Sequence, residues 1–327
     1  FVKILLISPT FSGIGGIAQH VRGLNQYLRD SGNQVDVLSS DNSFTIPFKG
    51  LKNPSFMISS SLKTKFMKKY DVIHAHNIPS AKAMKNAKGK KILSLHGIFS
   101  EQVNMLHGKT TGNISKKYET DALQWADAIT VVSKEAKEYY KKLGYDVFHI
   151  PNAINLKQIP KQGEKLYANQ IIFAGRISKE KGIIELLEML DKIPKDIHLV
   201  IVGKGPEEKL VREKITKFEN CHYMGYQSHE NTLKLIKGSD LLIQPSLTEG
   251  ISSTILESMA CKTPIIASKI GGNLELIKNK KNGLLIDPKN DFSSIVLNLL
   301  YDKEQSSQFR HESLKILSNY SWERVGK

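Results

Sequence analysis

Short apolar runs rich in β-branched residues alternate with helical patterns through both halves of this 327-residue chain. Strands that are apolar on both faces and separated by helices are typical of parallel sheets covered on both sides. The helical patterns include residues 17–31 and 114–126. We predict strands over 2–8, 34–40, 71–76, 90–97, 128–133 and 147–151, and then over 170–176, 197–205, 221–226, 240–246, 263–268 and 282–288.

The repetition of this scheme predicts two Rossmann-like domains. A chain of this length exceeds what one hydrophobic core usually organises. The segment 151–170 carries two prolines and a polar run, and we interpret it as the hinge. In doubly wound sheets ligands bind beyond the carboxyl ends of the strands, so the loops after the predicted strands are where a site is expected.

Composition and charge narrow the function. The chain is 40% hydrophobic and 24% charged, as in ordinary globular proteins, and no apolar run approaches the roughly 18 residues of a membrane span. Cys221 and Cys261 have no metal or redox spacing, and the chain opens without a signal-peptide pattern. Both observations favour a cytoplasmic location.

The net charge of +15 is uneven. Residues 1–150 hold 21 Lys and Arg against 11 Asp and Glu, whereas residues 151–327 hold 26 against 21. The first half is therefore the better candidate for an anionic partner such as phosphate, a lipid headgroup or nucleic acid. A solvated lysine-rich surface explains the charge equally well.

A glycine-rich loop follows the first predicted strand. Gly13, Gly15 and Ala18 match the dinucleotide fingerprint G-x-G-x-x-A, but four residues separate the first glycine from the strand, where the fingerprint requires direct succession. Gly15 and Gly16 still let the backbone approach an anion at a helix N-terminus. An anionic ligand, a structural turn and NAD binding all remain open, in that order.

Two cations lie after the strand at 170–176. Arg176 ends it, and Lys181 precedes the helical pattern of residues 182–190. Two cations beside unpaired amides at a helix start suit a diphosphate. A solvated Lys/Arg/Glu loop is the alternative.

Two carboxylates lie in the stretch "SLTEGISSTILESMACKTPII" at residues 246–266. Glu249 falls in the loop after a strand, and Glu257 falls about one turn inside the next helix. Helical side chains tilt toward the N-terminus, so Glu257 can point back toward the loop and accept from sugar or ribose hydroxyls. Thr254 and Glu257 also fit a capping box, S/T-x-x-E, which is the competing interpretation.

Taken together, these stretches resemble a known family. "GRISKEKG" followed by "PSLTEGISSTILESMACKTPIIASKIGGNLELIKNKKNGLLIDP" is similar to the donor-binding half of the family 4 retaining glycosyltransferases, with their E-x7-E pair and GT-B fold. The landmarks "GGIAQHV", "DVIHAH", "LSLHG", "ADAITVVS", "IPNAIN", "IVGKGP" and "YSWERV" follow in family order over nearly the whole chain.

The resemblance implies two parallel-sheet domains facing across a cleft: an acceptor-side domain at 1–152 and a donor-binding domain at 153–318, with the segment 319–327 crossing back to the first. It also implies a role for each matching residue. Arg176 and Lys181 would hold the donor diphosphate, Glu257 the ribose, and Glu249 the donor sugar; His96 would lie by the sugar and acceptor. The other donor contacts implied are Gly15, Gly16, Gly203, Gly205, Tyr226, Gly250, Ile251, Ser252 and Ser253.

One departure affects donor choice. The family's common loop is EGFG, whereas this chain has Glu249-Gly250-Ile251-Ser252, which keeps the amides and loses the aromatic side chain. The resemblance thus implies a nucleotide-diphosphate sugar donor, UDP-sugar favoured over GDP-sugar, and retention at the anomeric carbon. Front-face displacement is preferred over a double displacement on Glu249.

We expect no metal and no other cofactor. The chain has no D-x-D motif, and Arg176 and Lys181 can replace a metal at the diphosphate. His74 and His76 share one strand face, where core or cleft-lining histidines are a better account than a metal pair. A GT-B-type UDP-sugar epimerase, an NAD-dependent oxidoreductase using Asp36 or Asp41 for the ribose, and a nucleic-acid binder rank below the transferase.

The segment 60–70 combines lysines with apolar residues. Leu62, Phe66, Met67 and Tyr70 would share one face of a helix here, ringed by Lys63, Lys65, Lys68 and Lys69. This pattern is typical of an interfacial helix on anionic membrane, although an ordinary packed helix is the stronger alternative. It suggests a glycan or lipid-linked acceptor at the inner membrane face.

Overall fold

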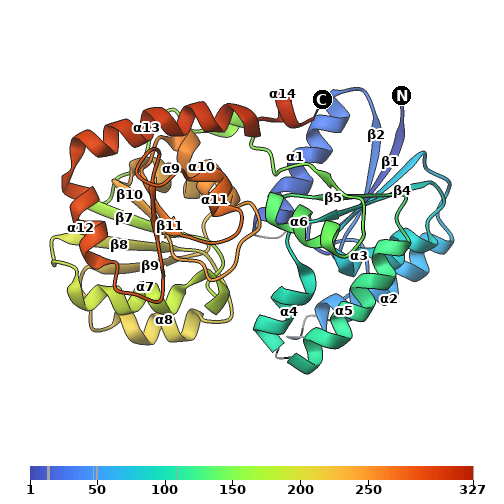
Figure 1. Cartoon of the computed structure of the whole chain (residues 1–327), viewed down its shortest axis with the longest axis horizontal. Coiled ribbons are helices and arrows are strands. Elements are labelled where there is room, and N and C mark those ends of the chain that lie inside the picture. Colours follow the sequence, from blue (N-terminus) through green and yellow to red (C-terminus); the bar gives the residue numbers. More distant parts are fainter. Residues whose placement is uncertain (13–14, 47, 49–50, 108, 327) are drawn as a thin grey trace. The chain divides into compact units, whose positions relative to one another are not determined.

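The computed structural model describes residues 1–12, 15–46, 48, 51–107 and 109–326. The chain forms two compact units, one comprising Phe1–Ala153 together with the chain end from Val325 on, the other Ile154–Arg324. Each unit is a parallel sheet with helices on both faces (Figure 1). Each predicted strand range overlaps a strand, and the α/β class with two parallel sheets is confirmed.

The first unit contains a sheet of strand order β2-β1-β3-β4-β5-β6, with every neighbouring pair parallel. Its strands are β1 (Lys3–Ile7), β2 (Gln34–Leu38), β3 (Val72–His76), β4 (Lys90–Leu95), β5 (Ala128–Val131) and β6 (Phe148–His149). Its helices are α1 (Gly16–Asp30), α2 (Lys52–Lys65), α3 (Ile78–Asn86), α4 (Phe99–His107), α5 (Lys109–Gln124) and α6 (Lys134–Lys142).

Strand β1 shows why both faces of this sheet are covered. Side chains alternate along a strand, so Leu5 and Ile7 face one way and Ile4 and Leu6 the other. The first pair packs in the core formed with α2, α3, α5 and α6, and the second pair packs against Val21 of α1. All four are buried, as a central parallel strand requires.

The second unit has the strand order β12-β11-β10-β7-β8-β9. Its strands are β7 (Asn169–Ala174), β8 (Ile197–Val202), β9 (Cys221–Gly225), β10 (Leu241–Gln244), β11 (Ile265–Ser268) and β12 (Leu284–Ile286). Its helices are α7 (Ile183–Met189), α8 (Glu208–Ile215), α9 (His229–Gly238), α10 (Ser253–Cys261), α11 (Asn273–Leu276), α12 (Ser293–Tyr301), α13 (Lys303–Leu317) and α14 (Trp322–Val325). The last residue of α14, Val325, is already assigned to the first unit. In Figure 1, α7 and α8 lie on one side of the sheet, and α9 and α10 on the other.

The helix predicted over 60–70 is wrong in its position. Helix α2 runs over Lys52–Lys65 and ends there, with Phe66 as its C-cap. Met67 and Tyr70 pack into the core instead of sharing an exposed face with Leu62. Within the described part of the chain, no helix has both the length and the apolarity that crossing a bilayer demands.

A glycine brings two loops of the second unit into direct contact. Gly182, which follows a 3-10 turn at Lys179–Lys181, has φ 69°, a left-handed conformation. A Cβ at this position would lie 1.8 Å from the carbonyl oxygen of Pro245. Only glycine therefore allows the segment after β7 to lie against the segment after β10, and the hydrogen bond from Leu247 N to Glu180 O, at 2.9 Å, closes the contact.

We expect Gly182→Ala to destabilise the protein by about 3 kcal/mol or more, since it combines left-handed strain with a backbone clash. Gly225 is a matched control, because it has φ 64° with nothing within 4 Å of its added Cβ. Gly225→Ala should cost only about 1 kcal/mol. Urea unfolding followed by circular dichroism measures both, and equal losses would contradict the close approach.

Candidate active site

The loops after β7 and β10 form an ion pair in the second unit. Lys181 Nζ lies 2.5 Å from Glu249 Oε1, and Ser246 Oγ donates to the same oxygen at 3.0 Å. The Glu249 side chain is only 8% exposed and that of Lys181 25%. A buried carboxylate at a strand end is thus balanced by a cation from the neighbouring strand's loop.

Arg176 precedes Lys181 by five residues in the same loop. Its guanidinium is mostly exposed, and its Nη1 lies 3.5 Å from Glu180 Oε1. Its backbone is fixed by the end of β8. A Cβ on Gly203 would lie 1.8 Å from the carbonyl oxygen of Gly175, and a Cβ on Gly205 would lie 2.1 Å from that of Ile177. The two predicted donor glycines therefore let the backbone around Arg176 lie directly against the β8 loop.

Helix α10 carries the second glutamate. Its N-cap is Ser252, whose Oγ accepts from Ile255 N at 3.4 Å. The capping box of Thr254 with Glu257 is wrong, because the helix begins two residues earlier than that motif needs. Glu257 is buried and contacts His229 Nε2 at 2.9 Å, so its carboxylate is held by α9.

The loop between Glu249 and α10 turns its side chains inward. Ile251 and Ser252 are both buried, at 4% exposure each, whereas Ser253 is partly exposed. The Gly250 backbone lies against Gly272, where a Cβ would lie 1.7 Å from the Gly250 oxygen. The Ile251 side chain is therefore covered by protein and is not available to a ligand.

An exposed aromatic ring follows β9. Tyr226 is about half exposed, and Lys204 Nζ lies 5.5 Å from its ring centroid. Both residues follow strands that are neighbours in the sheet, so they share one edge with Arg176. An aromatic face beside a cation can stack on a nucleobase.

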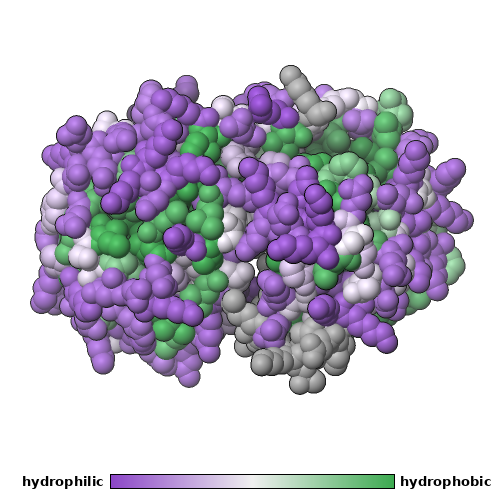
Figure 2. Space-filling view, viewed as in Figure 1, coloured by the Kyte–Doolittle hydropathy of each residue, from purple (hydrophilic) through white to green (hydrophobic). Residues whose placement is uncertain are grey.

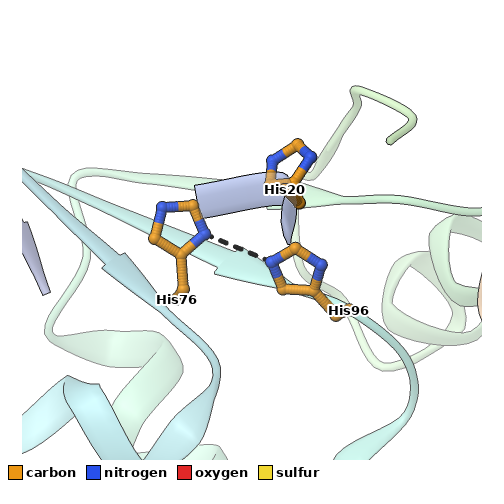
Figure 3. A group of neighbouring side chains, drawn as sticks. All are labelled: His20, His76 and His96. Carbon is orange, nitrogen blue, oxygen red and sulfur yellow. Dashed lines mark hydrogen bonds between the residues drawn. The ribbon is translucent and has the colours of Figure 1, made fainter. Parts of the chain in front are cut away.

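In the first unit, histidines gather at the corresponding edge. His76 ends β3, His96 follows β4, and His20 comes from α1 (Figure 3). His76 Nδ1 and His96 Nε2 are hydrogen-bonded at 3.2 Å, and the backbone N of His96 donates to Asn77 Oδ1 at 2.9 Å. Asn77 itself has φ 61°, an uncommon conformation for a residue other than glycine.

Burial keeps these imidazoles neutral. It lowers the pKa of His96 and of His74 to about 4, with repulsion from His74 adding to the effect at His96. Burial also lowers the pKa values of His20 and His76 well below the usual range, and repulsion from neighbouring imidazoles lowers them further. At neutral pH the cluster can accept or donate hydrogen bonds but carries no charge.

Gly15 and Gly16 lie at the start of α1, the helix that supplies His20 to this cluster. Gly15 is the N-cap of α1 with φ 125°, and Gly16 begins the helix. Gly13, the first glycine of the dinucleotide pattern, lies outside the described residues. The acids considered for an NAD ribose have other partners: Asp41 accepts from Ser12, and Asp36 accepts from Tyr70.

Two contacting residues were not predicted as site residues. His229 holds Glu257, and His20 completes the histidine cluster. His20 stands in the quoted landmark "GGIAQHV", so its position just after the glycines could have marked it as a site residue. No sequence motif around His229 predicts a site residue, because His229 of α9 contacts Glu257 of α10 only once the two helices pack together in the folded chain.

Two family models together match the chain from residue 14 to residue 315. "Glycosyltransferase Family 4" matches residues 14–158, and "Glycosyl transferases group 1" matches residues 155–315. These ranges cover Gly15 and Gly16, the histidine cluster, both cations and both glutamates. The chain belongs to the family 4 glycosyltransferases.

Relatives of this glycosyltransferase span its length. A phosphatidyl-myo-inositol mannosyltransferase of Mycobacterium leprae is 23% identical over 99% of this chain and 94% of its own. Sucrose-phosphate synthase from Thermosynechococcus elongatus superposes with a TM-score of 0.81 at 20% identity, covering 98% and 96% of the two chains. Anabaena HepE in complex with UDP-glucose gives 0.76 at 18% identity, covering 99% and 97%. The glycosyltransferase therefore has the GT-B fold.

The cap of α10 gives a test in this glycosyltransferase. Ser252→Ala removes the side chain that accepts from Ile255 N and should cost about 1 kcal/mol of stability. Thr254→Ala is the control and should change the free energy of unfolding by less than about 0.5 kcal/mol. Urea midpoints measure both; a larger loss for Thr254→Ala would restore the capping box.

Proposed function

We propose that this glycosyltransferase moves a sugar from a nucleotide-diphosphate sugar, UDP-sugar before GDP-sugar, to an acceptor hydroxyl with retention at the anomeric carbon. The observation that carries this is the Lys181–Glu249 pair, held by neighbouring strands with Arg176 beside it. A cation that already balances a buried carboxylate can bind a diphosphate without moving far. The UDP-glucose complex of the structurally similar HepE supports the donor class.

In this proposal each chemical group of the nucleotide-sugar donor is bound by named residues. Lys181 and the exposed Arg176 bind the diphosphate and offset the charge that grows on the leaving nucleotide. Glu257, held by His229, accepts from the ribose hydroxyls, and the Tyr226 ring stacks on the base. Glu249 and the amides of residues 250–253 contact the sugar. Gly15 and Gly16 at the α1 N-terminus contribute amides to the diphosphate, and His96 contributes an imidazole to sugar or acceptor.

The chemical step is a front-face displacement. The acceptor oxygen bonds to the anomeric carbon while the bond from that carbon to the diphosphate oxygen breaks. The acceptor proton passes to the departing phosphate oxygen. A double displacement on Glu249 is disfavoured, because Lys181 and Ser246 both stabilise its anion and so weaken it as a nucleophile. Arg176 and Lys181 supply the positive charge, so turnover needs no metal and no cofactor.

The acceptor is a glycan or lipid-linked alcohol at the inner face of the membrane. The name of the mycobacterial relative, a phosphatidyl-myo-inositol mannosyltransferase, supports a lipid acceptor. Hydrophilic side chains cover much of the face shown in Figure 2. Exposed apolar residues nevertheless form a stripe along α2 and its caps. The stripe consists of Leu51, Ile58, Leu62 and Phe66, which are exposed and spaced 7, 4 and 4 residues apart, on one helical face.

Lysines flank this stripe. Lys65 of α2 and Lys82 and Lys85 of α3 line a groove of about 470 Å³ that Ile58 and Leu62 also line. Exposed apolar side chains ringed by cations suit an anionic bilayer surface, where burial and charge attraction add. We infer that this stripe is the membrane contact.

Lys181→Ala should lower kcat/KM at least about 100-fold, because the diphosphate then loses one of the two cations that offset its charge. The neighbouring Lys179 is exposed, and Lys179→Ala should retain turnover within about twofold. Donors are first selected by thermal shift with UDP-, GDP- and ADP-sugars, and assays run in EDTA. Equal activity of the two variants would refute the diphosphate role, and full loss in EDTA would refute metal independence.

The stripe predicts flotation with vesicles containing anionic lipid at low salt. Leu62→Ser with Phe66→Ser should abolish flotation, since it removes two exposed apolar anchors. The control double variant changes Tyr301 and Leu314, exposed apolar residues of α12 and α13 in the other unit, to Ser. No flotation of the unaltered protein, or equal loss in both double variants, would contradict this membrane contact.

A further inference from the structure

Three imidazoles converge within the first unit. One ring nitrogen of each of His20, His76 and His96 lies within 4.8 Å of those of the other two. Figure 3 shows His20 above the hydrogen-bonded pair of His76 and His96. The His20 ring meets both others edge-on, with centroids 5.8 and 5.1 Å away. Three separate elements, α1 and the ends of β3 and β4, supply these side chains.

The spacing suits a tetrahedral metal ion. Zinc–nitrogen bonds of 2.0–2.1 Å at tetrahedral angles separate two ligand nitrogens by about 3.4 Å. His76 Nδ1 and His96 Nε2 are 3.2 Å apart, so one ion can bridge them with little movement. His20, which is partly exposed, supplies the third nitrogen from the first turns of α1. Three imidazoles leave a fourth position for water or another ligand.

The protonation state suits metal binding as well. A neutral imidazole has one unprotonated ring nitrogen with a lone pair, and this is the form that binds a metal ion. In the hydrogen bond between the two rings one facing nitrogen carries the proton, so that imidazole moves its proton to its outer ring nitrogen, Nε2 in His76 or Nδ1 in His96, when both facing nitrogens bind an ion. Forming the site therefore exchanges one hydrogen bond for metal bonds and releases no net proton.

The ligand set also selects the ion class. No carboxylate joins the cluster among the described residues, and imidazole favours zinc, cobalt, nickel and copper over magnesium and calcium. His74 stacks on His76 with ring centroids 4.4 Å apart, and Ser94 Oγ lies 2.6 Å from His74 Nε2. These contacts hold the β3 imidazoles in place around the site.

We propose that His20, His76 and His96 form a binding site for one transition-metal ion of the zinc class, and that its occupation inhibits sugar transfer. The inhibition rests on the proposed function, in which His96 contacts the sugar or acceptor. A metal on Nε2 of His96 withdraws that nitrogen from the reaction. The bound metal ion thus inhibits sugar transfer and takes no part in the reaction.

Cobalt titration of the full chain, free of any polyhistidine tag and stripped with EDTA, tests the binding. We expect one Co²⁺ per chain with visible absorption bands of a tetrahedral site, displaced by Zn²⁺. His20→Asn removes one ligand and leaves His76 and His96 in place, so it should weaken binding at least tenfold, and circular dichroism checks that the variant keeps the fold. Absent bands, or unchanged affinity in His20→Asn, would overturn the proposal.

A second histidine pair provides the matched control. His198 Nδ1 of β8 and His222 Nε2 of β9 lie 3.0 Å apart in the other unit, and no third possible metal ligand joins them among the described residues. The double variant His198→Gln with His222→Gln should bind Co²⁺ as the unaltered chain does. Loss of the bands in this control would assign the ion to that pair and overturn the assignment to the His20 cluster.

Turnover then tests inhibition separately. Stoichiometric Zn²⁺ should lower the transfer rate at least tenfold in the unaltered chain, and the concentration required should rise at least tenfold in His20→Asn. Tight binding with undiminished turnover would overturn the inhibitory role. A chain that binds Co²⁺ but transfers no sugar from any nucleotide donor contradicts the proposed function, while the binding result still supports the site.

Discussion

The pairing of Lys181 with Glu249 depends on the order of strands in the second sheet. Strands β7 and β10 are neighbours although β8 and β9 lie between them in the sequence, because the chain turns from one side of β7 to the other. At such a switch point the loops leave adjacent strands in opposite directions and open a crevice at the carboxyl ends. Gly182 then lets one loop lie against Pro245, which brings the cation to the carboxylate.

The first sheet repeats this geometry with different chemistry. There β1 lies between β2 and β3, and the glycine-rich loop and His76 emerge from the neighbouring strands β1 and β3. Charged groups populate the edge in the second unit, whereas buried neutral imidazoles populate it in the first.

Local patterns were insufficient where one helix could begin at several residues. The lysine-rich stretch at 60–70 suggested a helix, but Tyr70 is drawn into the core beside β3, so α2 ends at Lys65. Thr254 and Glu257 had capping-box spacing, but Ser252 caps α10 and His229 binds Glu257 instead. In each case the local sequence allowed two helix boundaries of nearly equal energy, and a contact with a distant segment decided which one formed.

The sequence by itself determined the two parallel sheets, because apolar β-branched runs between helices can be buried on both faces in few other ways. It also determined the residue types at the strand ends, including Arg176, Lys181, Glu249 and Glu257, and with them the family. Only the tertiary structure decided which of these side chains meet. Lys181 and Glu249 are 68 residues apart, and His20 and His96 are 76 apart. Such contacts follow from strand order and backbone approach, which no local pattern encodes.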